Sequence, residues 1–233
     1  MENLGLDRVV IVQGSAHGFM LDAAIEPVAQ LGKRARGVAV APADVSDATL
    51  DRLHEAGFRA LRVVTRVKGG VSPDQAEALA RRIARLGWHM QLLLNGPRDM
   101  ADMAPLLARL PVPCVIDSMA RFSPEDVPYH PGLTALLRLL ETGKIWIKLN
   151  AIERRSQFGT PYQDMTPLAN ALIAARPDRL VWGTDWPHTS AWDRAMPEDA
   201  DLLDWSLQWD GGEATRKAIL VDNPVRLYGF EPL

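Results

Sequence analysis

The sequence predicts an α/β fold with a parallel sheet. Seven short apolar runs recur along the chain, and segments of helix length lie between them. The runs are continuously apolar rather than alternating, which is typical of strands buried on both faces of a parallel sheet. Their spacing of roughly 23–35 residues is that of one strand–helix unit.

The order of elements follows from these patterns. Strands are expected at 9–13, 37–41, 60–64, 90–94, 114–117, 145–149 and 180–183. Helices with apolar residues at three-to-four spacing are expected near 21–31, 73–86, 103–110, 163–176 and 213–221. Ser72-Pro73-Asp74 has the cap, first-turn proline and first-turn acid of a helix start. Asn223 and Pro224 are expected to begin the final helix in the same way.

The strand count bears on the architecture. A (β/α)₈ barrel has eight strands, whereas a doubly wound open sheet can use seven. The residues after the first strand, 13–18, do not match the Gly-x-Gly-x-x-Gly pattern of a dinucleotide-binding sheet. Residues 4–8 resemble the end of a helix that feeds a strand, so the chain is expected to begin one unit late. No linker interrupts it, and we predict one domain over 1–233.

Composition excludes several classes of function. The formal net charge is -3 and hydrophobic residues make up 47%, without the basic surplus of a nucleic-acid-binding protein. The single cysteine, Cys114, lies in an apolar run and is expected to pack as a small hydrophobic residue. The N-terminus has no signal-peptide pattern, and no apolar run approaches the ~20 residues of a membrane span. We expect a cytoplasmic protein with neither a nucleic acid nor a membrane partner.

One segment stands out as a candidate for catalysis. The last expected strand runs through Val181 and Trp182 into Gly-Thr-Asp-Trp-Pro-His, which puts Asp185 at a strand end and His188 just beyond. Carboxylates at the C-terminal ends of parallel barrel strands are typically catalytic. The alternative is that Asp185 caps the next helix.

Other polar side chains follow the remaining expected strands. Because parallel strands end on one rim, several basic groups there favour an anionic, carboxylated substrate, although each could instead be solvated or cap a helix. The candidates for substrate binding are Ser15, His17, Arg62, Arg66, Lys68, Asn95, Ser118, Arg121, Arg154 and His188.

The residues alone give little support to a tight metal site or a serine nucleophile. The five histidines include no His-x-His and no His-x-x-x-His pair. His54 is expected inside a helix and His89 before a strand on the opposite rim, so both are interpreted as structural. No Gly-x-Ser-x-Gly elbow is present.

Several motifs together resemble the amidohydrolase-related (amidohydrolase 2) family, in particular its lactonases that act on 2-pyrone-4,6-dicarboxylate and sulfomuconolactone. The matching stretches cover nearly the whole chain in the family's order. They are Val-Gln-Gly-Ser at 12–15, Gly-Phe-Arg-Ala-Leu-Arg at 57–62, Leu-Gly-Trp-His at 86–89, Val-Ile-Asp-Ser-Met-Ala-Arg at 115–121, Ile-Trp-Ile-Lys-Leu-Asn at 145–150, the Pro-Asp-Arg-Leu segment through His at 177–188, and Asp-Asn-Pro-Val-Arg-Leu-Tyr-Gly-Phe at 222–230.

The resemblance implies a fold, and the chain departs from the family pattern in two places. The fold is a TIM-type (β/α)₈ barrel of the amidohydrolase superfamily, here apparently lacking the first strand. That strand carries the family's His-x-His pair, which this chain does not have. Ser118 also replaces the histidine of the family's Asp-His-Met-Gly-Arg motif.

The resemblance also implies roles for particular residues. Asp185 would be the base that activates water for hydrolysis of a lactone. Substrate carboxylates would be held by Arg62 with Lys68 or Arg66, and the anion site would be completed by Ser15, Arg121 and either Arg154 or Arg155. Asp185 alone remains of the usual metal ligands. The cofactor is therefore either none or one divalent ion, Zn or Mn, whose missing ligands are supplied otherwise.

Three functions remain open. The first is a hydrolase of a lactone or cyclic ester of a small carboxylic acid. The second is a catalytically impaired relative that binds an anionic small molecule, and the third is a metal-dependent decarboxylase of ring acids. A seven-stranded chain would expose strand edges, for which a homo-oligomer is one remedy.

Overall fold

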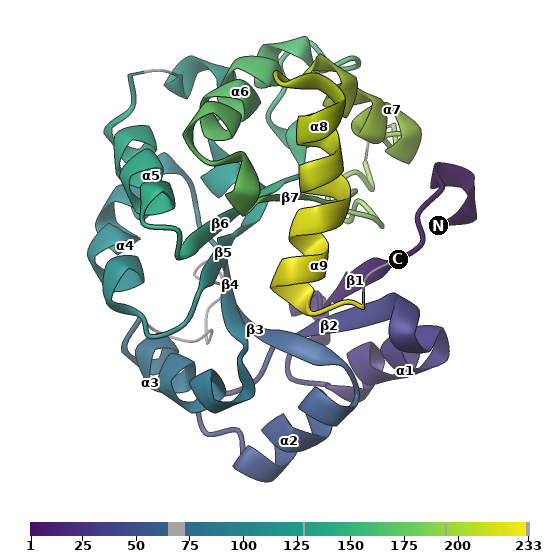
Figure 1. The fold of residues 1–233 in the computed structure, drawn as a ribbon, viewed down its shortest axis with the longest axis vertical. Coiled ribbons are helices and arrows are strands. Elements are labelled where there is room, and N and C mark those ends of the chain that lie inside the picture. The colour runs from purple at the N-terminus through teal and green to yellow at the C-terminus, as the bar shows by residue number, and fades with distance from the viewer. Residues whose placement is uncertain (65–72, 128, 194, 232–233) are drawn as a thin grey trace. The chain divides into compact units, whose positions relative to one another are not determined.

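The computed structural model describes residues 1–64, 73–127, 129–193 and 195–231. All seven expected strands are present, each within two residues of its expected bounds, and they follow one another in chain order in one sheet (Figure 1). They are β1 (Val9–Val12), β2 (Ala35–Ala39), β3 (Phe58–Val64), β4 (His89–Leu93), β5 (Cys114–Ile116), β6 (Ile145–Leu149) and β7 (Leu180–Trp182). The α/β class is therefore confirmed.

The chain forms two compact units. The first unit comprises Met1–Leu94, Pro105–Val115 and Val225–Leu233, and the second comprises Asn95–Ala104 and Ile116–Pro224. The α-helices among the described residues are α1 (Asp22–Leu31), α2 (Asp47–Glu55), α3 (Pro73–Ile83), α4 (Pro97–Arg109), α5 (Pro131–Glu141), α6 (Thr166–Ala175), α7 (Asp199–Asp204), α8 (Gly212–Lys217) and α9 (Asn223–Tyr228).

In the first unit, β1 to β4 pair in parallel, and α1, α2 and α3 pack against neighbouring strands. Gly37 permits the close approach of β3, because a Cβ at this position would lie 2.5 Å from the ring of Phe58. The buried side chains of Val38 and Ala60 pack with Tyr228 and Phe230 from the C-terminal segment. The end of the chain thus completes the core of this unit.

Two histidines of the first unit serve packing, as the sequence indicates. His54 lies in α2, where its Nδ1 accepts a hydrogen bond of 2.9 Å from Trp88 Nε1. His89 is the first residue of β4 and is buried, with its ring edge-on to Tyr228 at 5.2 Å between centroids. Cys114, at the start of β5, is buried, and its Sγ lies 3.7 Å from the Val112 carbonyl oxygen.

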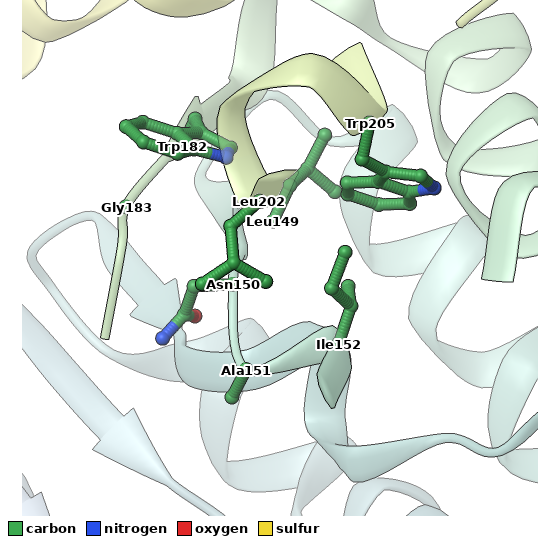
Figure 2. A pocket seen from close by; sticks show the side chains of 8 residues that line it. All are labelled: Leu149, Asn150, Ala151, Ile152, Trp182, Gly183, Leu202 and Trp205. Carbon is green, nitrogen blue, oxygen red and sulfur yellow. The ribbon is translucent and has the colours of Figure 1, made fainter. Parts of the chain in front are cut away.

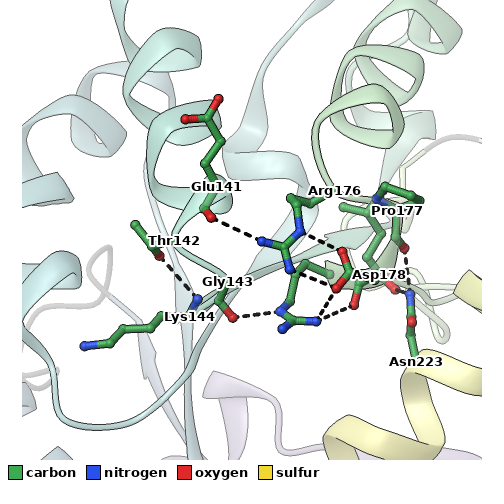
Figure 3. Close-up of polar contacts among 10 residues, drawn as sticks. Glu141, Thr142, Gly143, Lys144, Arg176, Pro177, Asp178 and Asn223 are labelled. Atoms are coloured by element: carbon green, nitrogen blue, oxygen red, sulfur yellow. Dashed lines mark hydrogen bonds and ion pairs between the residues drawn. The ribbon is translucent and has the colours of Figure 1, made fainter.

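In the second unit, β6 and β7 pair in parallel, and α5 packs against β6 and α6. The segments that lead into these strands are held by a polar cluster centred on Asp178 (Figure 3). Asp178 accepts from the guanidinium groups of Arg176 and Arg179, which also donate to the carbonyls of Glu141 and Gly143 at 3.1 and 2.7 Å. These contacts therefore hold the N-terminal ends of β6 and β7 in place. The candidate site residues lie at the opposite, C-terminal ends of the two strands.

The final helix begins differently from the expectation. The prediction that Asn223 caps it is wrong, because α8 continues through a π-helical segment, Ala218–Asp222, directly into α9. The amide of Asn223 is used elsewhere: Nδ2 donates to the carbonyls of Pro177 and Leu180 at 2.8 and 2.7 Å. The side chain thus secures the start of β7 rather than a helix end.

No helix in the described part of the chain combines the length and the apolar character that crossing a membrane requires.

Candidate active site at the ends of β5, β6 and β7

Unusual backbone conformations gather in the second unit, just after the ends of β5, β6 and β7. Ser118, Met119, Ala120 and Arg121 follow β5 with φ between 49° and 62°. Ala151 follows β6 with φ 59°, and after β7 Asp185 and His188 have φ 71° and 54°. Such left-handed conformations cost non-glycine residues free energy and cluster at functional sites. This rim of the second unit is therefore the candidate active site.

Asp185 is the central carboxylate of this rim. The helix that follows it, α7, begins only at Asp199, so the alternative in which Asp185 caps the next helix is wrong. Its Oδ1 accepts a hydrogen bond of 3.3 Å from Asn150 Nδ2, and its Oδ2 forms an ion pair with the Arg154 guanidinium. Burial raises the pKa of Asp185, and the negative charge of Asp117 adds to the rise, against the lowering effect of Arg154. A carboxylate whose pKa is raised in this way is a stronger base than a free carboxylate.

Glu153 is a second carboxylate of the site, which the sequence interpretation missed. Its side chain is only 6% exposed, and its Oε1 lies 3.3 Å from Arg154 Nε. Burial raises the pKa of Glu153, and the nearby charge of Asp185 raises it further. The available signal was its position: Glu153 follows β6 on the same rim as the basic residues that were noted there.

His188 connects Glu153 to the next helix. Its side chain is 2% exposed, and its Nε2 lies 3.0 Å from Oδ1 of Asp199, the first residue of α7. Its Nδ1 faces Glu153 Oε1 at 3.9 Å and has no hydrogen-bond partner among the described residues. The His188 ring is thus held through Nε2, and the lone pair or proton of Nδ1 is not used in a hydrogen bond to the described residues.

A buried ion pair supports the rim from below. Lys148 Nζ lies 2.8 Å from Asp117 Oδ1, with the two side chains 11% and 3% exposed. Next to it, the backbone N–H of Ser118 donates to Asn150 Oδ1 at 2.9 Å. The ends of β5 and β6 are therefore tied together by a charge pair and a hydrogen bond.

The charge of this rim is more acidic than the sequence interpretation expects. Four carboxylates lie here, those of Asp117, Glu153, Asp185 and Asp199, and the two cations Lys148 and Arg154 pair with them. The acids were underestimated because Glu153 and Asp199 were not counted. Lys148 and Arg154 therefore stabilise carboxylates of the site itself.

The predicted site residues have different surroundings. Ser118, Arg154, Asp185 and His188 come together in the second unit, as described above. Arg121 is half-buried in the strained turn after β5, and Asn95 is exposed, with its backbone N–H donating to Asp99 at 2.9 Å.

The remaining candidates are in the first unit or outside the described residues. Arg62 lies in β3, where Nη1 donates to the Gln13 carbonyl at 3.2 Å, and His17 is exposed in a 3₁₀ turn that begins at Ser15. Arg66 and Lys68 lie outside the described residues.

Three side chains of the rim could hold a divalent cation. One atom from each of Glu153, Asp185 and His188 can be chosen so that all three lie within 4.8 Å of one another. Glu153 Oε2, Asp185 Oδ2 and His188 Nδ1 are all buried without a hydrogen-bond partner among the described residues. Two carboxylates and an imidazole suit Zn²⁺ or Mn²⁺, so the donor set fits such an ion. Arg154 competes with it, because its guanidinium already contacts both carboxylates.

A small pocket lies next to Asn150, at the ends of β6 and β7 (Figure 2). Its lining is mostly apolar: Leu149, Asn150, Ala151, Ile152, Trp182, Gly183, Leu202 and Trp205. Asn150 is the polar member, and its amide extends away from Trp205 (Figure 2). Asn150 thus borders a pocket whose other lining residues are mostly apolar.

Comparison with known proteins places the chain in a family. A family model described as amidohydrolase matches residues 1–230. The D-galactarolactone isomerase of Agrobacterium fabrum is 31% identical over 234 residues, covering 100% of this chain and 80% of that protein. The 2-pyrone-4,6-dicarboxylate hydrolase of Comamonas testosteroni is 33% identical over 238 residues, covering 97% of this chain and 77% of the relative.

A solved structure agrees with these relatives. A ligand-free crystal structure from Agrobacterium tumefaciens has a TM-score of 0.89 and 31% identity, covering 100% of this chain and 84% of that one. The resemblance inferred from the motifs is therefore confirmed. The chain belongs to the amidohydrolase family and is an enzyme of hydrolase-like type.

Proposed function

We propose that this enzyme opens the ring of a lactone formed by a small carboxylic acid, with Asp185 as the general base. The observation that carries the proposal is a largely buried carboxylate with a raised pKa at the end of β7, held at one oxygen by Asn150. The similarity to proteins named as a pyrone-dicarboxylate hydrolase and a galactarolactone isomerase supports the lactone as substrate class. The whole-chain likeness to the Agrobacterium structure supports a TIM-type barrel without its first strand as the architecture.

The hydrolysis needs a base, a nucleophile and stabilisation of negative charge. Asp185 takes a proton from water while the water oxygen bonds to the lactone carbonyl carbon. The resulting tetrahedral oxyanion collapses, the ring C–O bond breaks, and the proton passes from Asp185 to the departing alkoxide. Arg154 lies beside Asp185 and can donate to the oxyanion, a role that a guanidinium performs well. The product is the open hydroxy acid.

Isomerisation of a lactone is the second candidate, favoured by the relative named D-galactarolactone isomerase. In that reaction a hydroxyl of the same substrate replaces water as nucleophile, and the acyl group moves from one ring oxygen to another. The required base is the same, so Asp185 would serve either reaction. Whether water reaches the carbonyl decides between them.

A divalent ion is compatible with this site. Glu153, Asp185 and His188 would hold it, because one ligand atom from each lies within 4.8 Å of the others. When bound, Zn²⁺ or Mn²⁺ supplies Lewis-acid polarisation of the lactone carbonyl. Arg154 offers the same site a permanent positive charge.

A carboxylated substrate remains part of the proposal. Its anionic groups would be bound by the predicted residues Arg62, Arg66 and Lys68, together with Arg121.

The test is turnover of a lactone panel by the purified chain and two variants. The panel contains 2-pyrone-4,6-dicarboxylate, D-galactarolactone and uncharged δ-valerolactone, and products are separated as open acid or isomeric lactone. Asp185→Asn removes the base, and Asp204→Asn is the matched control, since Asp204 is exposed at the end of α7. We expect turnover of a carboxylated lactone that Asp185→Asn lowers about 10²–10⁴-fold and Asp204→Asn leaves unchanged. An inactive wild type, prepared with and without Zn²⁺ or Mn²⁺, would instead favour a binding protein without catalysis.

A further inference from the structure

Asn150 uses both ends of its amide between two strand ends of the second unit. The side chain lies just after β6 and the residue is 8% exposed. Its Oδ1 accepts from the Ser118 backbone N–H at 2.9 Å, and its Nδ2 donates to Asp185 Oδ1 at 3.3 Å. The amide therefore joins the ends of β5, β6 and β7 in one line of hydrogen bonds.

The orientation of the amide follows from its neighbours. A backbone N–H can only donate, so the Asn150 oxygen must face Ser118 and its NH₂ group must face Asp185. This direction is set by the turn after β5, where Ser118 has φ 54°. The adjacent Asp117 is held by Lys148, which lies two residues before Asn150 and so on the same face of the strand. The Asp117–Lys148 ion pair thus holds the turn that carries the Ser118 N–H, and this N–H sets the orientation of the Asn150 amide.

The consequence for Asp185 is that its two oxygens become different. Oδ1 accepts from Asn150 Nδ2, and the position of this NH₂ group is fixed because Asn150 Oδ1 accepts from the Ser118 N–H. Oδ2 is buried and forms an ion pair with the guanidinium of Arg154, whose side chain is 26% exposed, but it accepts no hydrogen bond from the described residues. We propose that Asn150 is a positioning residue that locks the Asp185 carboxylate through Oδ1 and thereby presents Oδ2 as the oxygen that accepts the proton. This inference deepens the proposed function and rests on it.

The contact can be tested without any substrate. The chain contains five asparagines, so selective ¹⁵N labelling of asparagine gives a short list of side-chain amide signals, and Asn150→Ala identifies the one that belongs to Asn150. Asp185→Asn and Asp204→Asn each add a sixth asparagine signal, and we expect the Asn150 signal to move in Asp185→Asn and to stay in place in Asp204→Asn. An Asn150 amide chemical shift that is the same in the wild type and in Asp185→Asn would overturn the proposal.

The positioning role is tested with a substrate that the wild type turns over. Asn150→Asp keeps the shape and can still accept from Ser118, but it cannot donate to Asp185. We expect kcat to fall about 10- to 100-fold with KM little changed, since misplacing a catalytic group costs rates of this order. Asn150→Gln keeps the amide and should recover part of kcat. The matched control is Asn170→Ala, which removes a remote amide that accepts from the Asp210 N–H at 3.0 Å.

The two arms separate the possible failures. A wild type that opens no lactone, with the amide signal still responding to Asp185→Asn, contradicts the proposed function but supports the contact. An active wild type whose kcat is the same in Asn150→Asp refutes the positioning role. Equal losses in Asn150→Asp and Asn170→Ala, matched by equal losses of stability, would refute it as well and assign Asn150 to the scaffold.

Discussion

The buried pair of Asp117 and Lys148 gives a quantitative test of how the rim is supported. Its atoms lie 2.8 Å apart, and the side chains are only 3% and 11% exposed. Removing one partner of such a pair leaves the other charge buried without compensation, which typically costs about 3–5 kcal/mol. For a chain of 233 residues, each kcal/mol corresponds to about 2–4 °C, so each single variant should melt roughly 6–20 °C lower.

The perturbation is a double-mutant cycle with Asp117→Asn, Lys148→Met and the combination. The combined variant leaves no unpaired charge, so it should cost clearly less than the two single changes added together. Free energies of unfolding come from urea titrations at pH 7, with thermal melts as a second readout.

The chain also offers a matched exposed pair as control. Lys217 and Asp222 lie 2.6 Å apart, but their side chains are 63% and 55% exposed. The same cycle there should give changes within about 1 kcal/mol, since solvent screens exposed pairs. If the buried variants cost no more than the exposed ones, or if their effects add without coupling, the reasoning about this pair is refuted.

Two further predictions concern the carboxylates around Arg154. Because burial and the Asp185 charge raise the pKa of Glu153 in the fold, this group contributes stability below its unfolded pKa of about 4.3, and the contribution is lost as pH rises through the folded value. Glu153→Gln should therefore melt higher than the wild type at pH 8, with a gap that closes toward pH 4; an unchanged gap in scanning calorimetry would count against this assignment. Arg154→Gln removes the cation that competes for Asp185 Oδ2, so calorimetric titration should show Zn²⁺ binding at least about 10-fold tighter; weaker binding would show that Arg154 does not compete with the ion.

Much of the fold could be predicted because its signals are local. Parallel strands buried on both faces appear in the sequence as continuous apolar runs, and all seven were located within two residues. The helix start at Pro73 followed from a first-turn proline. Asn223 was misjudged because its amide is used by residues more than 40 positions earlier, the carbonyls of Pro177 and Leu180. Such a contact leaves no local pattern.

The candidate site was predictable in part for the same reason. Asp185 lies only three residues after the end of β7, so its place on the rim could be derived from the sequence. Glu153 and Asp199 have no motif of their own, and they become part of the site only through Arg154 and His188. Nor does the sequence reveal that Lys148 and Arg154 pair with acids, since pairing depends on the turns after β5 and β7.

The most direct test of the central claim is the pH dependence of kcat/KM for lactone opening, measured on the wild type and on Asp185→Asn. Because the pKa of Asp185 is raised above its ordinary value of 3.8, the wild type should lose activity on the acid side with an apparent pKa above that value. Asp185→Asn should turn over about 10²–10⁴-fold more slowly and lack this acid limb. Turnover by Asp185→Asn at the wild-type rate, with the acid limb intact, would contradict the role of Asp185 as the base.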